Sequence, residues 1–142
     1  MQDLFSLKGR VALITGGSRG IGKMIAEGYL RYGAKVYISA RKGGALEETA
    51  AELSKLGSCT PLVVNASGAD GAKAMAEAFL KHEKALDILV NNAGAAWGAP
   101  FDEFPEDGWD KVVDLNLKTP FSLTQALHGA LKAGAAKGHL AK

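Results

Sequence analysis

Short apolar runs alternate with longer amphipathic stretches through the first ninety residues of the chain. The apolar runs lie at 11–14, 36–39, 62–64 and 88–90, and within them apolar residues follow one another rather than alternating with polar ones. Strands of this kind are typical of a parallel sheet whose two faces are both covered by helices. The pattern therefore predicts an α/β fold made of successive βαβ units.

Between these runs, apolar residues recur every three or four positions, which predicts helices that pack against the sheet. The predicted core stripes are Ile21, Met24, Ile25 and Tyr29 in the first helix, Leu46, Ala50 and Leu53 in the second, and Ala72, Met75, Ala76, Phe79 and Leu80 in the third. A fourth and longest helix is expected over about 108–133, with Trp109, Val112, Val113, Leu117 and Phe121 along one side. The small, glycine-punctuated residues 134–142 predict a flexible tail.

The composition is that of a globular protein and fits one domain over 1–142, with 47% hydrophobic and 23% charged residues. The net charge is only +2 and the basic residues are dispersed, so no nucleic-acid partner is implied. The single cysteine, Cys59, cannot form an intramolecular disulfide and has no metal-binding context, so no metal site is expected. Without a signal sequence or about 18 consecutive apolar residues, we expect a cytoplasmic protein with no membrane partner.

A glycine-rich turn follows the first predicted strand and opens the first predicted helix. Its sequence, TGGSRGIG, occupies positions 15–22. Glycines let a pyrophosphate approach the backbone, and the start of a helix offers free N–H groups and a positive dipole end. A third glycine, Gly22, would let the helix pack closely on the strand. The predicted cofactor-binding residues here are Thr15, Gly16, Ser18, Arg19, Gly20, Ile21 and Gly22; the alternative is an ordinary loop.

The end of the second strand indicates which nicotinamide dinucleotide would bind. Proteins that prefer NAD usually place an Asp or Glu there to bind the ribose hydroxyls. This chain has Ser39, Arg41 and Lys42 instead, and Arg19 lies in the glycine turn. A hydroxyl and cations suit a 2′-phosphate, so the sequence predicts NADP(H) in preference to NAD(H). The alternative is that these are solvated surface charges.

Three motifs in order resemble the short-chain dehydrogenase/reductase family: TGGSRGIG at 15–22, NNAG at 91–94, and Asn116 within DLNLK. The resemblance covers the whole chain but little more than half of the family's usual domain. The stretch 91–116 is especially similar to 3-oxoacyl-carrier-protein reductases, including those named for rhamnolipid biosynthesis. The resemblance implies a Rossmann-type sheet with strand order 3-2-1-4 and an NADP(H)-dependent oxidoreductase acting on a small carbonyl or secondary alcohol.

The same resemblance implies further cofactor contacts after the third and fourth strands. Asn91, Ala93 and Gly94 would lie against the adenosine ribose, while Asn65 and Ala66 would flank the adenine. Asn65 stands where many relatives carry an aspartate, which keeps a hydrogen-bonding side chain but removes its charge. The alternative for the NNAG motif is that its asparagines are turn formers.

Asn116 is the predicted catalytic residue. It lies on the otherwise apolar stripe of the long helix, where an amide needs a partner. Pro120 has no N–H to donate to the carbonyl of residue 116, so we expect the helix to be interrupted there. By resemblance, that carbonyl would hold a water of the proton relay. The alternative is a polar residue on a tilted surface helix.

The family's proton donor, Tyr-x-x-x-Lys with a serine, is not recognisable in this chain. The residues four places after Tyr29, Tyr32 and Tyr37 are glycine, valine and arginine, and Ser122 falls inside a predicted helix. We therefore expect the cofactor-binding portion of an oxidoreductase, truncated before the catalytic segment. The alternative is a non-catalytic dinucleotide-binding module or pseudoenzyme. The helix over 108–133 and the bare edge of the fourth strand predict a homo-oligomer.

Overall fold

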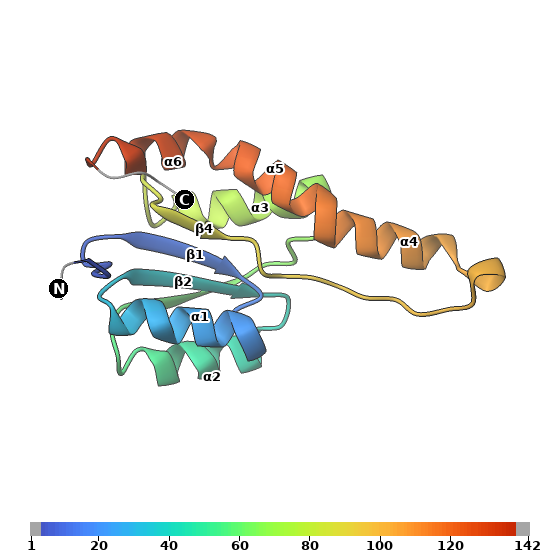
Figure 1. Cartoon of the computed structure of the whole chain (residues 1–142), viewed down its shortest axis with the longest axis horizontal. Coiled ribbons are helices and arrows are strands. Elements are labelled where there is room, and N and C mark those ends of the chain that lie inside the picture. The colour runs from blue at the N-terminus through green and yellow to red at the C-terminus, as the bar shows by residue number, and fades with distance from the viewer. Residues whose placement is uncertain (1–3, 139–142) are drawn as a thin grey trace.

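A four-stranded parallel sheet organises the computed structural model, which describes residues 4–138 (Figure 1). Its strands lie in the order β3-β2-β1-β4, as predicted, with β1 pairing to β2 on one side and to β4 on the other. The strands are β1 (Val11–Thr15), β2 (Lys35–Ala40), β3 (Cys59–Val63) and β4 (Ile88–Val90).

Helices cover both faces of the sheet (Figure 1). One face is covered by α1 (Gly20–Arg31) and α2 (Gly43–Leu53), and the other by α3 (Gly68–Leu80), α5 (Thr119–Ala126) and α6 (His128–Ala135). Successive strand residues point to opposite faces, so Leu13 joins the α3 side of the core and Ile14 the α1 side. This two-sided burial is the reason that the strands read as continuous apolar runs.

The apolar stripe predicted for the first helix is partly wrong. Ile21 and Met24 are each 70% exposed, whereas Gly22, Ala26 and Leu30 face the sheet. Small residues allow α1 to lie close to β1, which turns the larger residues beside them outward. The second stripe is fully buried, as predicted, and the third is buried except for Leu80 at its end.

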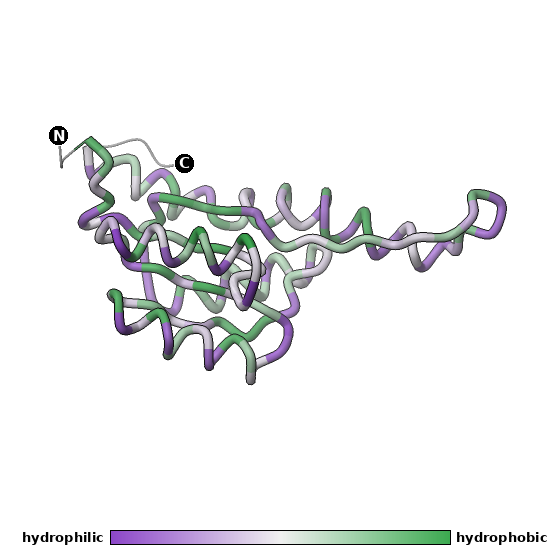
Figure 2. The backbone as a smooth tube through the Cα atoms, turned by 60° about the horizontal axis from the view of Figure 1, so that its bottom comes forward, coloured by the Kyte–Doolittle hydropathy of each residue, from purple (hydrophilic) through white to green (hydrophobic). Residues whose placement is uncertain are grey.

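The long helix predicted over 108–133 is present, but it is not one uniform α-helix. It is divided into α4 (Glu106–Val113), the π-helical turn η2 (Asp114–Lys118), α5 and α6. Residues 95–113, which include the 3₁₀ turn η1 (Phe101–Glu103), extend away from the sheet as an arm (Figures 1 and 2). Three residues of the helix's apolar side face outward, since Trp109, Leu117 and Phe121 are 63%, 69% and 69% exposed.

The flexible tail predicted from residue 134 begins too early. Gly134 and Ala135 complete α6, and a Cβ at position 134 would lie 2.1 Å from the carbonyl oxygen of Leu86. The N–H of Leu86 donates to the carbonyl of Ala130, so α6 is fixed to the start of β4. The glycine marks a close approach of two backbones rather than flexibility. Positions 139–142 of the predicted tail lie outside the described residues.

Within residues 4–138 there is no helix both long and apolar enough to cross a membrane. Cys59 is buried at the start of the edge strand β3, and burial raises the pKa of its thiol to about 11. A thiol with so high a pKa is a poor nucleophile at neutral pH. In the same described part of the chain, His, Cys, Asp and Glu side chains form no group of three that could hold a metal ion.

Candidate functional site

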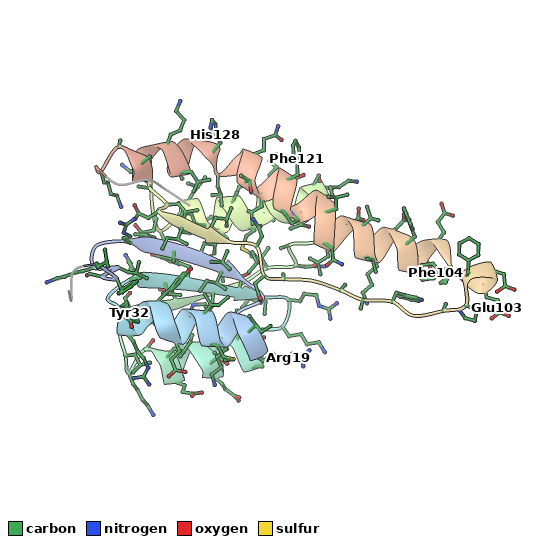
Figure 3. The ribbon with its side chains drawn as sticks, viewed as in Figure 1. Arg19, Tyr32, Glu103, Phe104, Phe121 and His128 are labelled. Carbon is green, nitrogen blue, oxygen red and sulfur yellow. The ribbon has the colours of Figure 1, made fainter. Side chains whose placement is uncertain are left out.

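A cleft of about 730 Å³ opens at the carboxyl ends of the strands. This is the edge at which ligands bind in open α/β sheets. Figure 3 shows Arg19 at the start of α1, on this side of the sheet. The cleft brings together eleven of the predicted residues: Gly16, Ser18, Arg19, Gly20, Ile21, Ser39, Arg41, Asn65, Ala66, Ala93 and Gly94.

The glycine turn has the close packing that its sequence predicts. Gly16 and Gly20 have φ values of +70° and +57°, a left-handed conformation that favours glycine. A Cβ at Gly22 would lie 2.3 Å from the carbonyl oxygen of Gly16, and a Cβ at Gly16 would lie 3.0 Å from the Cα of Ala93. Glycine at these two positions therefore lets α1, the turn and the loop after β4 pack closely together.

The start of α1 is open to an anion. Arg19 is the N-cap residue with extended backbone, and no side chain caps the helix. The first N–H groups of a helix have no partner within the helix, so they can donate to a phosphate. Thr49 of α2 donates from Oγ1 to the carbonyl of Ser18 at 2.8 Å, which holds the turn in place.

Thr15 and Asn92 join the glycine turn to the loop after β4. The Nδ2 of Asn92 donates to the carbonyls of Thr15 and Gly16, each at 3.0 Å. The Oγ1 of Thr15 accepts the N–H groups of Asn92 and Ala93 at 3.1 and 3.0 Å. Thr15 and Gly22 therefore lie behind the cleft wall and maintain its shape, rather than lining it.

The structure separates the two asparagines of NNAG differently from the sequence interpretation. Asn92 lines the cleft, whereas the exposed Asn91 does not. The prediction names Asn91 as the cofactor contact, with the alternative that both asparagines are turn formers. Adjacent loop residues point in different directions, and the sequence carries no signal that says which of two identical side chains turns inward.

Cations and a hydroxyl surround the end of β2. Ser39 is buried, while Arg19 and Arg41 line the cleft with exposed side chains. Lys42 is the N-cap residue of α2 and lies outside the cleft wall. Among the ion pairs formed within residues 4–138, none includes Arg19, Arg41 or Lys42. These cations are therefore available to an anionic ligand.

The loop after β3 forms another part of the wall. Val64, Asn65, Ala66 and Ser67 line the cleft, and the N–H of Ser67 donates to Oδ1 of Asn65 at 3.3 Å. A Cβ at Gly71 of α3 would lie 2.5 Å from the carbonyl carbon of Ala66, so the helix supports this loop closely from behind.

Asn116 occupies the centre of the π-helical turn η2, which confirms the expected interruption of the helix. Its side chain is exposed rather than buried, yet it is fully paired with the backbone of Ala95. Nδ2 donates to the carbonyl of Ala95 at 2.7 Å, and Oδ1 accepts the N–H of Ala95 at 2.9 Å. Asn116 lies outside the cleft wall and contacts it through Ala95.

The sequence interpretation missed four wall residues from the arm and the turn that follows it: Ala95, Ala96, Lys111 and Leu115. Lys111 of α4 and Leu115 of η2 line the cleft four positions apart, the spacing of one helix face. The Nζ of Lys111 lies 5.6 Å from the ring centroid of Trp97, and this ring packs against Gly108. The helical spacing was visible in the sequence, but the direction of the arm was not.

The comparisons with known proteins agree with this geometry. The family model for short chain dehydrogenases matches residues 10–141. The chain is 47% identical over 135 residues to a rhamnolipids biosynthesis 3-oxoacyl-[acyl-carrier-protein] reductase of Pseudomonas aeruginosa, covering 95% of this chain and 53% of that protein. It is 36% identical over 126 residues to gluconate 5-dehydrogenase of Gluconobacter oxydans, covering 88% and 49%.

Solved structures show the same likeness. The NADP active-site complex of Pseudomonas aeruginosa RhlG superposes with a TM-score of 0.87 at 48% identity, covering 92% of this chain and 51% of that one. L-sorbose reductase from Gluconobacter frateurii, complexed with NADPH and L-sorbose, gives a TM-score of 0.84 at 32% identity, covering 94% and 51%. The chain thus spans about half the length of these relatives. With its glycine turn, strand order and family match together, the chain belongs to the short-chain dehydrogenase/reductase family of oxidoreductases.

Proposed function

We propose that this chain is the NADP(H)-binding portion of an oxidoreductase that transfers hydride between the nicotinamide ring and a carbonyl or secondary alcohol. One observation carries the proposal: the cleft joins an uncapped helix start to two cations that have no ion-pair partner in the described chain. The first feature suits a pyrophosphate, and the second suits the 2′-phosphate that distinguishes NADP(H) from NAD(H).

The residues fit this cofactor from one end to the other. In the proposal, Gly16, Ser18, Gly20 and Ile21 hold the pyrophosphate, and Ser39, Arg41, Arg19 and Lys42 hold the 2′-phosphate. Asn65 and Ala66 flank the adenine, and Ala93 and Gly94 face the adenosine ribose with Asn92 beside them in the cleft wall. Asn91 stays a proposed contact of the same motif from outside that wall. The bound cofactor would supply or accept the hydride.

Asn116 has a proposed catalytic role at the end of the cleft that would hold the nicotinamide. Its amide keeps Ala95 in place through two hydrogen bonds, which leaves its main chain to act separately. We propose that its carbonyl oxygen holds a water that passes a proton toward the reacting oxygen. The π-helical form of the turn supports this, because such turns expose backbone groups and are frequent at functional sites.

The proposed substrate class follows two of the relatives described above. One relative is named a 3-oxoacyl-[acyl-carrier-protein] reductase and another a gluconate 5-dehydrogenase. The first name describes reduction of a carbonyl, and the second describes oxidation of an alcohol. We propose a 3-oxoacyl thioester as the first substrate to test. Binding without turnover would instead favour a non-catalytic dinucleotide-binding module.

Cofactor titration of the purified protein tests the proposal. We expect NADPH to bind at least about tenfold more tightly than NADH, the value of one charge-assisted hydrogen bond. Arg19→Ala combined with Arg41→Ala should remove that preference while leaving NADH binding unchanged. The matched control is Arg31→Ala, which removes an arginine from the far end of α1 whose partner is Glu27 at 2.7 Å. Tighter binding of NADH than of NADPH would contradict the proposal.

We also propose that the exposed apolar row of Trp109, Leu117 and Phe121 is a contact between copies of the protein, in keeping with its exposure of 63–69%. Phe121→Glu should lower the mass measured by light scattering. The control Ala126→Glu places the same charge on an exposed position of α5 that points away from this row. An equal, unchanged mass for both variants would argue against this contact.

A further inference from the structure

Thr119 connects two parts of the cleft wall that are far apart in sequence. It is 3% exposed, and its Oγ1 contacts three backbone groups. It accepts the N–H of Gly68 at 2.9 Å and lies 2.8 Å from each of the carbonyl oxygens of Ala66 and Asp114. A hydroxyl has one proton, so it donates to one of these carbonyls at a time. The hydroxyl proton is therefore shared between two acceptors, the carbonyls of Ala66 and Asp114, which lie in different segments of the chain.

The first partner belongs to the loop proposed to hold the adenine. Ala66 lines the cleft, and Gly68 begins α3 directly after that loop. The loop has little freedom to move elsewhere, because Gly71 packs against Ala66 from behind. The Thr119 hydroxyl and the packing of Gly71 together therefore hold this part of the wall.

The second partner begins the π-helical turn. The N–H of Thr119 donates to the carbonyl of Asp114, and the same carbonyl oxygen is the second acceptor within reach of Oγ1. The same turn contributes Leu115 to the cleft wall and positions Asn116, whose amide holds the backbone of Ala95 from both sides. The geometry of this turn therefore sets the wall at the Asn116 end of the cleft.

We infer that Thr119 is a positioning residue that couples the adenine end of the cleft to the Asn116 end through its shared hydroxyl proton. The inference rests on the proposed function, because the adenine is assigned to the 65–66 loop by that proposal. A ligand held only at the adenine end changes the environment of the Ala66 carbonyl. The hydroxyl then redistributes between Ala66 and Asp114, and the turn that carries Asn116 responds.

Three variants of the protein isolate the hydroxyl. Thr119→Val removes it at similar volume, and Thr119→Ser keeps it. The matched control is Thr124→Val on the same helix, since Thr124 also donates to a backbone carbonyl, that of Pro120 at 2.7 Å, but touches no part of the cleft. The probe is 2′,5′-ADP, which carries the adenine and the 2′-phosphate and lacks the nicotinamide.

We expect Thr119→Val to weaken 2′,5′-ADP binding by about three- to tenfold, the effect of one lost hydrogen bond. Thr119→Ser and Thr124→Val should bind within about twofold of the wild type. Binding by Thr119→Val equal to that of a folded Thr124→Val would overturn the inference. If the wild type does not bind 2′,5′-ADP, the proposed function is wrong. If all four proteins bind 2′,5′-ADP equally, the inference about Thr119 is wrong and the proposed function stands.

Amide hydrogen exchange of the wild type provides a measurement that does not depend on the folding of a variant. We expect saturating 2′,5′-ADP to slow exchange of the Ala95 N–H, which bonds to Asn116, as well as exchange in the 65–68 loop. Protection of the loop with no change at Ala95 would refute the coupling. In Thr119→Val the effect at Ala95 should disappear, whereas direct contact of the ligand with Ala95 would preserve it.

Discussion

We call the end of the sheet at which its strands begin the amino edge, and the end at which they finish the carboxyl edge. The two edges differ in how their polar groups are used. At the amino edge, polar groups satisfy one another: buried Asp87 accepts the N–H of Val11 at 2.8 Å and pairs with Lys137 at 3.0 Å. Beside it, the hydroxyl of Tyr37 donates to Glu83 at 2.6 Å, and Lys35 pairs with the same carboxylate. At the carboxyl edge, exposed arginines and an uncapped helix start surround an open cleft.

This difference separates stability from binding within one small sheet. Closed networks of charges and hydrogen bonds lower the free energy of the folded state without offering anything to a ligand. Open donors and left-handed glycines contribute little to folding but can receive a phosphate. Substitutions at the amino edge should therefore change the free energy of unfolding alone, whereas those at the carboxyl edge should also change cofactor binding.

The largest effect is expected for Gly22→Ala at the carboxyl edge. The new Cβ would meet the carbonyl oxygen of Gly16 at 2.3 Å and Nδ2 of Asn92 at 2.5 Å, so the backbone of the turn and the Asn92 amide must both move to admit it. We expect the free energy of unfolding to fall by about 3 kcal/mol, with NADPH binding lost at the concentrations that saturate the wild type. Urea unfolding and fluorescence titration measure the two effects.

Gly28→Ala is the control within the same helix. A Cβ at Gly28 meets nothing within 4 Å, so alanine should stabilise α1 by about 0.5–1 kcal/mol and leave NADPH binding unchanged. Equal unfolding free energies for the two variants would show that the close approach at Gly22 is not a constraint.

Asp87→Asn should have the next largest effect, at the amino edge. The buried carboxylate loses its charge while Lys137 keeps its own, and we expect a loss of about 2–3 kcal/mol in the free energy of unfolding. The dissociation constant of NADPH should stay within about twofold, because the site lies at the opposite edge. Asp110→Asn on the exposed surface of α4 serves as the control. Weakened NADPH binding by folded Asp87→Asn would break the separation of the two edges.

Thr15→Val tests a residue behind the cleft. Its Oγ1 accepts two N–H groups, those of Asn92 and Ala93, and valine leaves both without that acceptor. We expect a loss of about 1–2 kcal/mol in the free energy of unfolding and about tenfold weaker NADPH binding. Thr15→Ser should restore both quantities. If Thr15→Val loses stability but binds NADPH normally, Thr15 contributes to folding alone, as the residues of the amino edge are expected to do.

The smallest effect is expected for Glu83→Gln and depends on pH. Burial alone would raise the pKa of Glu83, but hydrogen bonds from Lys35 and Tyr37 hold the pKa below its ordinary value of 4.5. The hydrogen bond with Glu83 raises the pKa of Lys35 above 10.5, and burial followed by that same carboxylate raises the pKa of Tyr37 above 10.0.

The sign of the pH dependence follows from these directions. A carboxylate with a depressed pKa stabilises the fold above its unfolded pKa, and the stabilisation disappears as the pH falls through the folded pKa. The stabilisation that comes from the raised pKa values of Lys35 and Tyr37 is lost only as the pH rises through those values. Glu83→Gln should therefore cost about 0.5–1 kcal/mol between about pH 5 and 10, since Lys35 is half exposed, and progressively less in acid. A difference that grows in acid, measured by urea unfolding, would contradict the assignment.

Local patterns were sufficient to predict the sheet and the glycine turn. Continuous apolar runs occur because both faces of each strand are buried. Gly16 and Gly22 mark close approaches to neighbouring backbone, and Gly20 marks a left-handed conformation that favours glycine. Both signals depend on residues that are close together in the sequence, so the sequence alone was enough to predict these features. The interruption at Asn116 was also predictable from nearby residues. In an α-helix the carbonyl of residue 116 would accept the N–H of residue 120, and Pro120 has no N–H.

The tertiary structure alone decided which side chains meet across the cleft. The sequence could not distinguish Asn92 from Asn91, place Lys111 in the wall, or show that Ile21 and Met24 face outward, because each depends on the angle at which an element meets the sheet. The partners of Thr119 were equally hidden, since Ala66 lies more than fifty positions away. The chain by itself determined its strands, its glycine cradle and its family; the contacts among distant segments determined which groups face a ligand, because contact geometry is a property of the packed elements rather than of any one of them.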